Sequence, residues 1–172
     1  MVDFQEIQIL SSLTTSVTSG TFTLALPIYS IQLPGLVDGF ISTSILNTTE
    51  DLTSFLEAGD KVMIDNVEYI IEEYQFVKSW MIVVTPPLST SITQMKIFTL
   101  PKTNPIVWDA TEIELRTSLE NIPEFGRVSV DRTAVGSSYS WSITFLTLPG
   151  DIENLHINSR HLLGSTPTMT IH

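Results

Sequence analysis

Two stretches of the chain carry the same series of landmarks. The first begins at Asn47-Thr48-Thr49-Glu50 and leads to an aromatic strand at Trp80. The second begins at Asp109-Ala110-Thr111-Glu112 and leads, at a nearly constant offset, to a similar strand at Trp141. A Phe-Thr-Leu triplet lies upstream of each stretch. Because self-similarity is the signature of repeat architecture, the landmarks predict two similar structural units, and such units more often build surfaces than active sites.

The start of the first stretch has the pattern of a helix N-terminus. Asn47 can accept a hydrogen bond from a free amide of the first turn, and Glu50 completes a capping-box pattern. Apolar residues follow at helical spacing, so we expect a helix over residues 47–58 that ends at Gly59.

The second stretch repeats this pattern. Asp109 takes the capping position and Glu112 the box position, and apolar residues again follow at helical spacing. We therefore expect a helix over residues 109–121, ended by Pro123 and Gly126.

Alternating apolar residues predict strands around both helices. Residues 4–10 form the first expected strand, with Phe4, Ile7 and Ile9 as its apolar members. Asp65-Asn66 predict a tight hairpin between two later strands, because both residue types tolerate positive φ. Each unit therefore has the order strand, helix, strand, strand. The predicted fold class is α+β, rich in strand, with mostly antiparallel sheets.

Aromatic and glycine motifs are concentrated in the second half of the chain. They are Phe98-Thr99-Leu100, Ile106-Val107-Trp108-Asp109-Ala110-Thr111, Glu114-Leu115, Phe125-Gly126-Arg127-Val128, Tyr139-Ser140-Trp141 and Gly150-Asp151. This pattern resembles the tandem repeat module of very large secreted or cell-surface proteins of oomycetes and algae, some of them fibrocystin-like. Residues 55–64 are similar to a barrel-like insert of the same proteins. We therefore expect a first unit, residues 1–94, that contains the insert, and a second unit, residues 95–172.

The resemblance implies extracellular, structural or adhesive roles without established catalytic residues. The function it implies is a non-catalytic interaction module of an extracellular or cell-surface assembly, with like modules or neighbouring proteins as partners. Two alternatives stay open: a carbohydrate- or calcium-dependent adhesion module, and a subunit of an intracellular or viral protein lattice. The sequence has no nucleophile elbow, phosphate-binding loop or HExxH metal helix, so an enzyme is the least supported class.

The charge balance limits the partners. The 172 residues include 19 Asp and Glu against 8 Lys and Arg, a formal net charge of -11. Nucleic acid and anionic membrane surfaces are therefore disfavoured as partners, because both attract basic proteins. No apolar run approaches the ~18 residues that span a membrane, so no membrane insertion is expected. The absence of cysteine excludes disulfides and thiolate metal sites.

The two terminal strands, residues 4–10 and 168–171, are apolar and carry almost no charge. Terminal strands of repeat units present unpaired backbone groups, so weak self-association through these ends is expected. High salt should favour it, because screening weakens the repulsion between acidic copies.

Five acids are the candidates for a metal site. Asp60, Asp65 and Glu68 lie near one expected hairpin, and Asp151 and Glu153 lie in one loop. Clustered carboxylates can hold calcium, but the ligand order of an EF-hand loop is missing. A solvated acidic surface is the favoured interpretation, so we predict no metal and no cofactor.

The three tryptophans, Trp80, Trp108 and Trp141, could stack on sugar rings or pack in a core. Trp80 and Trp141 lie in apolar strands, and Trp141 alternates with Ile143 and Phe145. Trp108 lies just before a cap, so core packing is the favoured interpretation for all three, and burial is predicted for Trp80 and Trp141.

Asn47-Thr48-Thr49 is the one N-glycosylation sequon of the chain. A sequon that is used lies on the protein surface. Asn47 is also the expected helix cap, and a glycan on a capping amide is awkward, so the sequence argues against modification.

Overall fold

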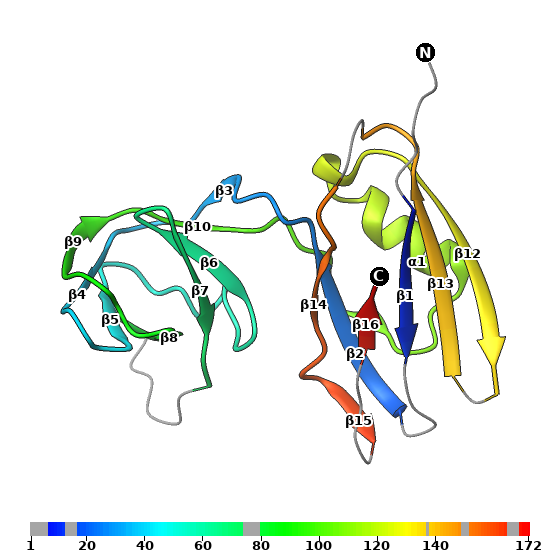
Figure 1. The fold of residues 1–172 in the computed structure, drawn as a ribbon, viewed down its shortest axis with the longest axis horizontal. Helices are drawn as coiled ribbons and strands as arrows, with labels where there is room; N and C mark the ends of the chain where they lie inside the picture. Colours follow the sequence, from blue (N-terminus) through cyan, green and yellow to red (C-terminus); the bar gives the residue numbers. More distant parts are fainter. Residues whose placement is uncertain (1–6, 13–16, 74–79, 137, 149–151, 165–168) are drawn as a thin grey trace. The chain divides into compact units, whose positions relative to one another are not determined.

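A computed structural model gives the structure of the chain and describes every residue except 1–6, 13–16, 74–79, 137, 149–151 and 165–168. Strands dominate the described part, which contains one α-helix, and the sheets are antiparallel (Figure 1). The strand-rich, mostly antiparallel architecture expected from the sequence is confirmed. The chain divides into two compact units: unit 1 contains Met1–Pro27 and Pro101–His172, and unit 2 contains Ile28–Leu100.

Unit 1 holds two sheets and a helix. Its strands are β1 (Ile7–Ser12), β2 (Val17–Ala25), β11 (Ile106–Val107), β12 (Val128–Val135), β13 (Ser138–Phe145), β14 (His156–Asn158), β15 (Leu162–Gly164) and β16 (Met169–Ile171). The helix α1 (Glu112–Glu120) is followed by a 3-10 turn, η1 (Pro123–Phe125). One sheet has the order β12-β13-β1-β16, and the other has the order β11-β2-β14 with β15 also paired to β2.

Both sheets and the helix of unit 1 share one apolar core. Trp141, Ile143 and Phe145 alternate along β13 and are fully buried, as predicted for Trp141. Leu115 and Leu119 of α1 pack into the same core. Alternation on β13 and helical spacing on α1 therefore direct apolar side chains to one interior.

The N-terminal strand is central in its sheet. β1 pairs with β13 on one side and with β16 on the other. The expectation that both terminal strands are open ends is therefore wrong for β1, because its backbone groups are used on both sides. β16 pairs with β1 alone among the described strands.

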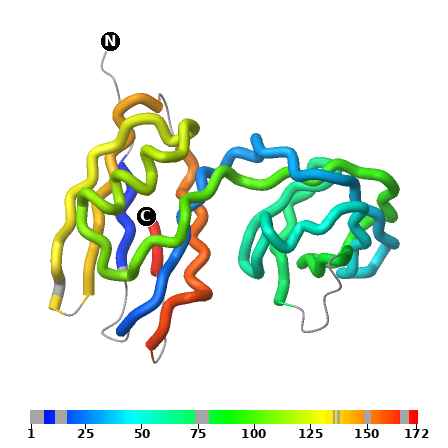
Figure 2. The backbone as a smooth tube through the Cα atoms, turned by 180° about the vertical axis from the view of Figure 1, so that it is seen from behind, coloured from blue at the N-terminus to red at the C-terminus, as the bar shows by residue number. Residues whose placement is uncertain are grey.

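The two units do not follow the expected division into residues 1–94 and 95–172. Ala25 forms a bridge with Lys102, and the Leu26 amide donates to the Pro101 carbonyl at 3.0 Å. The segments that leave and re-enter unit 1 therefore lie side by side (Figure 2). Unit 2 is an insertion between β2 and β11, because unit 1 needs strands from both ends of the chain.

Unit 2 consists of eight short strands in one curled sheet. They are β3 (Ile31–Gln32), β4 (Val37–Gly39), β5 (Ile45–Thr48), β6 (Lys61–Ile64), β7 (Val67–Ile71), β8 (Met81–Thr85), β9 (Ile92–Met95) and β10 (Ile97–Thr99). Their order is β3-β10-β6-β7-β8-β5-β4-β9. The β6–β7 hairpin turns at Asp65 and Asn66, which have φ values of 51° and 62°, as the sequence predicts.

The sheet of unit 2 curls round into a small barrel-like shape (Figure 1). β9 lies beside β4, β10 lies beside β6, and only Lys96 separates β9 from β10 in the chain. The chain thus passes directly from one strand to the other, and β3 and β9 are the end strands of the sheet. Buried side chains such as Leu46, Val62 and Val84 fill its core.

The helix expected over residues 47–58 is absent. Asn47 lies in strand β5, paired with β4 and β8, and is therefore not a helix cap. The helical spacing of Leu52 and Leu56 forms a single turn, in which the Leu56 amide donates to the Leu52 carbonyl, and both side chains are buried in the barrel core. Gly59 has a φ of 90° and lies in a turn instead of ending a helix.

The helix expected over residues 109–121 is present, but its cap lies two residues later than Asp109. Thr111 is the N-cap, and it forms the capping box with Glu114. The expected cap Asp109 lies in the turn before the helix. Gly126 ends η1 with a φ of 63°, and a Cβ there would lie 2.2 Å from Thr147 Oγ1. Since only one of the two stretches contains a helix, similarity of the two units is not confirmed.

Candidate functional site

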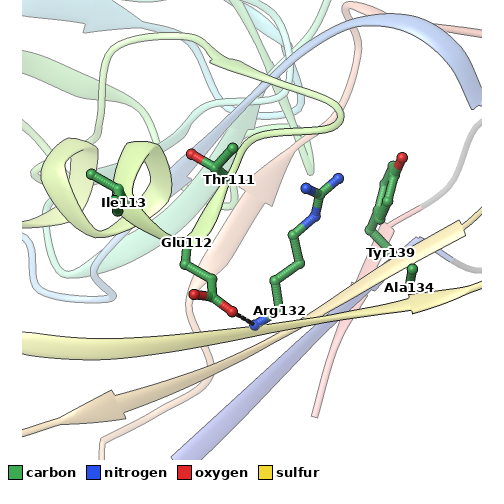
Figure 3. A pocket seen from close by; sticks show the side chains of 6 residues that line it. All are labelled: Thr111, Glu112, Ile113, Arg132, Ala134 and Tyr139. Atoms are coloured by element: carbon green, nitrogen blue, oxygen red, sulfur yellow. Dashed lines mark hydrogen bonds between the residues drawn. The ribbon is translucent and has the colours of Figure 1, made fainter.

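Unit 1 has a pocket at the start of α1. It has a volume of about 330 Å³ and is lined by Thr111, Glu112, Ile113, Arg132, Ala134 and Tyr139 (Figure 3). The helix contributes its first turn, and the hairpin β12–β13 contributes the other wall.

Arg132 is positioned in this pocket by aromatic rings. Its guanidinium carbon lies 3.7 Å from the ring centroid of Tyr139 and 5.9 Å from that of Trp141. Trp108 packs against Tyr139, with 5.5 Å between the centroids of the two rings. Trp141 is fixed in turn by its indole Nε1–H, which donates to the Ala110 carbonyl at 3.0 Å. Stacking on Tyr139 thus holds the charge of Arg132 at a defined place.

One nitrogen of the Arg132 guanidinium is unpaired among the described residues. Its Nε atom is buried and has no hydrogen-bond partner in the described part of the chain. A buried polar group without a partner is costly.

Glu112 is the one carboxylate that lines the pocket, and Glu114 follows in the same helical turn; both are held by backbone amides. Glu112 Oε1 accepts from the backbone amide of Arg132 at 2.9 Å. Glu114 accepts from the amide and hydroxyl of Thr111 at 2.7 and 2.9 Å. The hydrogen bonds from Thr111 lower the pKa of Glu114 below its usual range, and the charge of Arg132 is a smaller cause. With two acids beside one arginine, the pocket suits neutral acceptors, such as hydroxyls or carbonyls, better than anions.

The second surface feature is the outer face of the sheet β12-β13-β1-β16. Along β1, Ile7 and Ile9 are 56% and 45% exposed. Gln8 and Leu10, which alternate with them, are fully buried. The pairing register extends this face across the sheet, and we call it the hydroxyl face. It consists of Ile7, Ile9, Ser11, Ser129, Asp131, Thr133, Ser140, Ser142, Thr144 and Thr170.

The hydroxyl face carries little charge, although the chain as a whole has a net charge of -11. None of its side chains is buried, and Asp131 is its one charged member. Ser11 and Ser140 share a hydrogen bond at 3.0 Å across β1 and β13. Two exposed isoleucines on a central strand, surrounded by hydroxyls, form a surface that another protein can cover without desolvating many charges.

The acids proposed as calcium ligands are not brought together. Asp60 is buried and accepts from the Glu57 amide at 3.0 Å, and Asp65 occupies the exposed hairpin turn. Glu68 pairs with Lys61 at 2.7 Å. Glu153 is exposed, and Asp151 lies outside the described residues. No group of three or more potential metal ligands occurs within the described part of the chain.

The tryptophans have different environments. Trp141 is fully buried, as predicted, but Trp80 is 50% exposed, so its predicted burial is wrong. Trp80 lies in the turn just before β8, and the buried positions of that strand begin at Ile82.

Sequence reasoning missed Arg132 and the hydroxyl face. Ile7 and Ile9 were expected to be apolar members of a strand, but their side chains face outward. The alternation of Ser140, Ser142 and Thr144 with buried aromatics was the available signal, because one strand face must then be exposed.

Comparisons with protein-family models, with curated proteins and with solved structures found no match. No helix in the described part is long and apolar enough to span a membrane.

Proposed function

We propose that the chain is a structural, non-catalytic interaction module of an extracellular or cell-surface assembly, in which the hydroxyl face packs against a like module. The observation that carries the proposal is the exposure of Ile7 and Ile9 on a central strand. Because they alternate with buried residues on one strand, their side chains lie on the same face of the sheet and form a patch of the kind that a partner covers. The extracellular setting is supported by the resemblance to secreted repeat proteins.

The charge distribution favours a like module as the occupant. Two copies of a chain with a net charge of -11 repel each other, and the repulsion is weakest where each presents few charges. Asp131 is the one charged side chain of the face. A pair that meets through these faces therefore avoids most of the acidic surface.

The test is sedimentation of the whole chain over a range of protein concentration and salt. We expect concentration-dependent association that strengthens with salt, because the Debye length falls from about 10 Å at 0.1 M to about 3 Å at 1 M. Ile9→Asp should abolish association, because it adds a charge at the centre of the face. The matched control is Leu163→Asp, since Leu163 is also an exposed strand residue, at 59% against 45% for Ile9, but lies on β15. A wild-type chain that stays monomeric at high concentration and high salt overturns the proposal.

The pocket favours a second candidate, adhesion through a hydroxyl-rich ligand such as a sugar. Its guanidinium donors and the carboxylate of Glu112 match the donors and acceptors of sugar hydroxyls. Binding to a panel of immobilised glycans, lost in Arg132→Lys, is the expected result, because lysine keeps the charge but loses the planar fork. Equal binding by both proteins, or none by the wild type, contradicts this candidate.

A further inference from the structure

The sequon Asn47-Thr48-Thr49 lies on a strand and not at a helix cap. Along β5, Leu46 and Thr48 are buried, whereas Ile45 and Asn47 are exposed. The Asn47 side chain thus points away from the barrel core. Among the described residues, none hydrogen-bonds its amide group. The structural objection to modification, that a glycan would disturb a cap, therefore does not apply.

The surroundings of Asn47 are apolar on the side of β8, whereas Asp38 lies opposite it on β4. Met81 lies directly opposite Asn47 on β8, and Val83 lies opposite Ile45. Directly opposed side chains on paired strands lie about 4.5–5.5 Å apart, and diagonal ones about 7–8 Å. Ile45 is 38% exposed, and Met81 and Val83 are half-buried. An exposed asparagine therefore stands at the edge of a small apolar patch on the barrel surface.

We propose that Asn47 is an N-glycosylation site and that its glycan covers the patch of Ile45, Met81 and Val83. The inference rests on the proposed extracellular setting, since the donor is met on the secretory route. The first sugar lies over neighbouring strand residues, and its apolar ring face suits them. The patch is then shielded without a protein partner.

The chemistry uses a lipid-linked oligosaccharide pyrophosphate as the donor. The Nδ2 atom of Asn47 forms a bond to the anomeric carbon of the first sugar, and the bond from that carbon to the pyrophosphate oxygen breaks. The lipid pyrophosphate is the leaving group, and Nδ2 loses one proton. No oxidation or reduction takes place.

The glycan also restricts the assembly. It occupies the outer surface of β5 and β8 in unit 2, so that surface faces solvent. The hydroxyl face belongs to the other unit, unit 1. The two surfaces thus have separate roles, one shielded and one interacting.

The test is secretion of the whole chain from eukaryotic cells behind a cleavable signal peptide. We expect an intact mass increased by one N-linked glycan. Peptide N-glycosidase should remove it and leave aspartate at position 47, seen by peptide mapping. Asn47→Gln should be secreted at the mass of the unmodified chain.

The control is a variant at Thr49 that keeps both the sequon and the hydrogen bond of the local structure. Thr49 Oγ1 accepts from the Leu36 amide at 2.8 Å, so loss of the hydroxyl would disturb the barrel as well. Thr49→Ser keeps both the hydroxyl and the sequon, and it should carry the glycan. Translation with microsomes gives the same readout if a variant is retained inside the cell.

Shielding has a measurement of its own. Removal of the glycan from the folded wild type should increase the fluorescence of a hydrophobic dye, and Asn47→Gln with Ile45→Thr should reverse most of the increase. Wild-type chain secreted without a glycan overturns the inference, as does unchanged dye binding after deglycosylation. A glycosylated chain that never associates overturns the proposed packing instead, so the two failures are distinguishable.

Discussion

Gln8 explains why the apolar side chains of Ile7 and Ile9 on the first strand point to solvent and not to the core. Its side chain is fully buried, donates to the carbonyls of Ile152 and Glu153 at 3.2 and 3.1 Å, and accepts from the Leu155 amide at 3.0 Å. A buried amide with its hydrogen bonds satisfied is compatible with a core. Because side chains alternate along a strand, burial of Gln8 places Ile7 and Ile9 outside.

We expect Gln8→Leu to destabilise unit 1 although it makes the strand more apolar. The change leaves the Leu155 amide and two carbonyls without this partner. Each group left unpaired should lower the free energy of unfolding by about 1–3 kcal/mol. Chemical denaturation measures the loss. Gln32→Leu is a matched control, because Gln32 is exposed in the short strand β3 and the same substitution there should change little. An equal stability of Gln8→Leu and wild type contradicts the role of Gln8.

The two strand-associated tryptophans should differ in their effect on stability. Trp141→Ala removes a fully buried side chain and should cost about 3–5 kcal/mol. Trp80→Ala removes a half-exposed side chain and should cost under about 1 kcal/mol. Urea titrations measure the free energy of unfolding of both variants. Similar losses would contradict burial of Trp141 together with exposure of Trp80.

At the scale of elements, α1 protects the edge of β12. Glu112 and Glu120 are eight residues apart on the helix, about 12 Å along its axis. The amides they accept, of Arg132 and Val128, are four residues apart on the strand, about 13 Å. The two carboxylates thus match two edge amides, which would otherwise be open to another strand.

Removal of both carboxylates should expose this edge. Glu112→Ala with Glu120→Ala should cost about 0.5–1.5 kcal/mol for each lost hydrogen bond and should increase association under partly denaturing conditions. Alanine is the best helix former, so helix propensity does not explain a loss. Glu124→Ala is the control, because Glu124 is exposed in η1. Light scattering that is the same in the control and the double variant would exclude edge protection.

The capping box of α1 should contribute a pH-dependent part of the stability. Because the folded state lowers the pKa of Glu114, its contribution is present above the unfolded-state pKa and is lost as pH falls through the folded-state pKa. Glu114→Gln should therefore be less stable than wild type at pH 7, and the difference should shrink in acid. Denaturant titrations at pH 7 and in the acid range measure it. A difference that stays constant with pH would rule out the charged capping box.

At the scale of the whole molecule, unit 1 is continuous in space although it is divided in sequence. Its sheet joins β1 to β13, so a fragment of residues 95–172 lacks a central strand. The Leu26 and Pro101 backbones meet at the insertion point, at 3.0 Å.

Replacement of Ile28–Leu100 by a short Gly-Ser linker should therefore leave unit 1 folded. The expected result is cooperative thermal unfolding followed by near-ultraviolet circular dichroism, which reports the packed Trp141. The fragment 95–172 serves as the comparison and should lack such a transition. Cooperative folding of that fragment, or none in the linked protein, contradicts the two-unit organisation.

Local signals in the sequence determined several features correctly. Positive-φ residues at Asp65 and Asn66 fix a hairpin, and alternation fixes Trp141, Ile143 and Phe145 on one face. The spacing of Leu115 and Leu119 gives α1 its buried face. These features depend on neighbours within a few residues, so they can be predicted from the chain alone.

Tertiary structure decided the features that depend on distant partners. Asn47 has the sequence of a cap, but pairing of β5 with β4 and β8 makes it a strand residue, because a barrel satisfies more backbone groups than one isolated helical turn. The outward face of Ile7 and Ile9 follows from Gln8, whose partners lie more than 140 residues away. The place of Arg132 beside the start of α1 likewise needs the helix, β12 and Tyr139 together. Local propensity sets which elements are available, and the shared core selects among them.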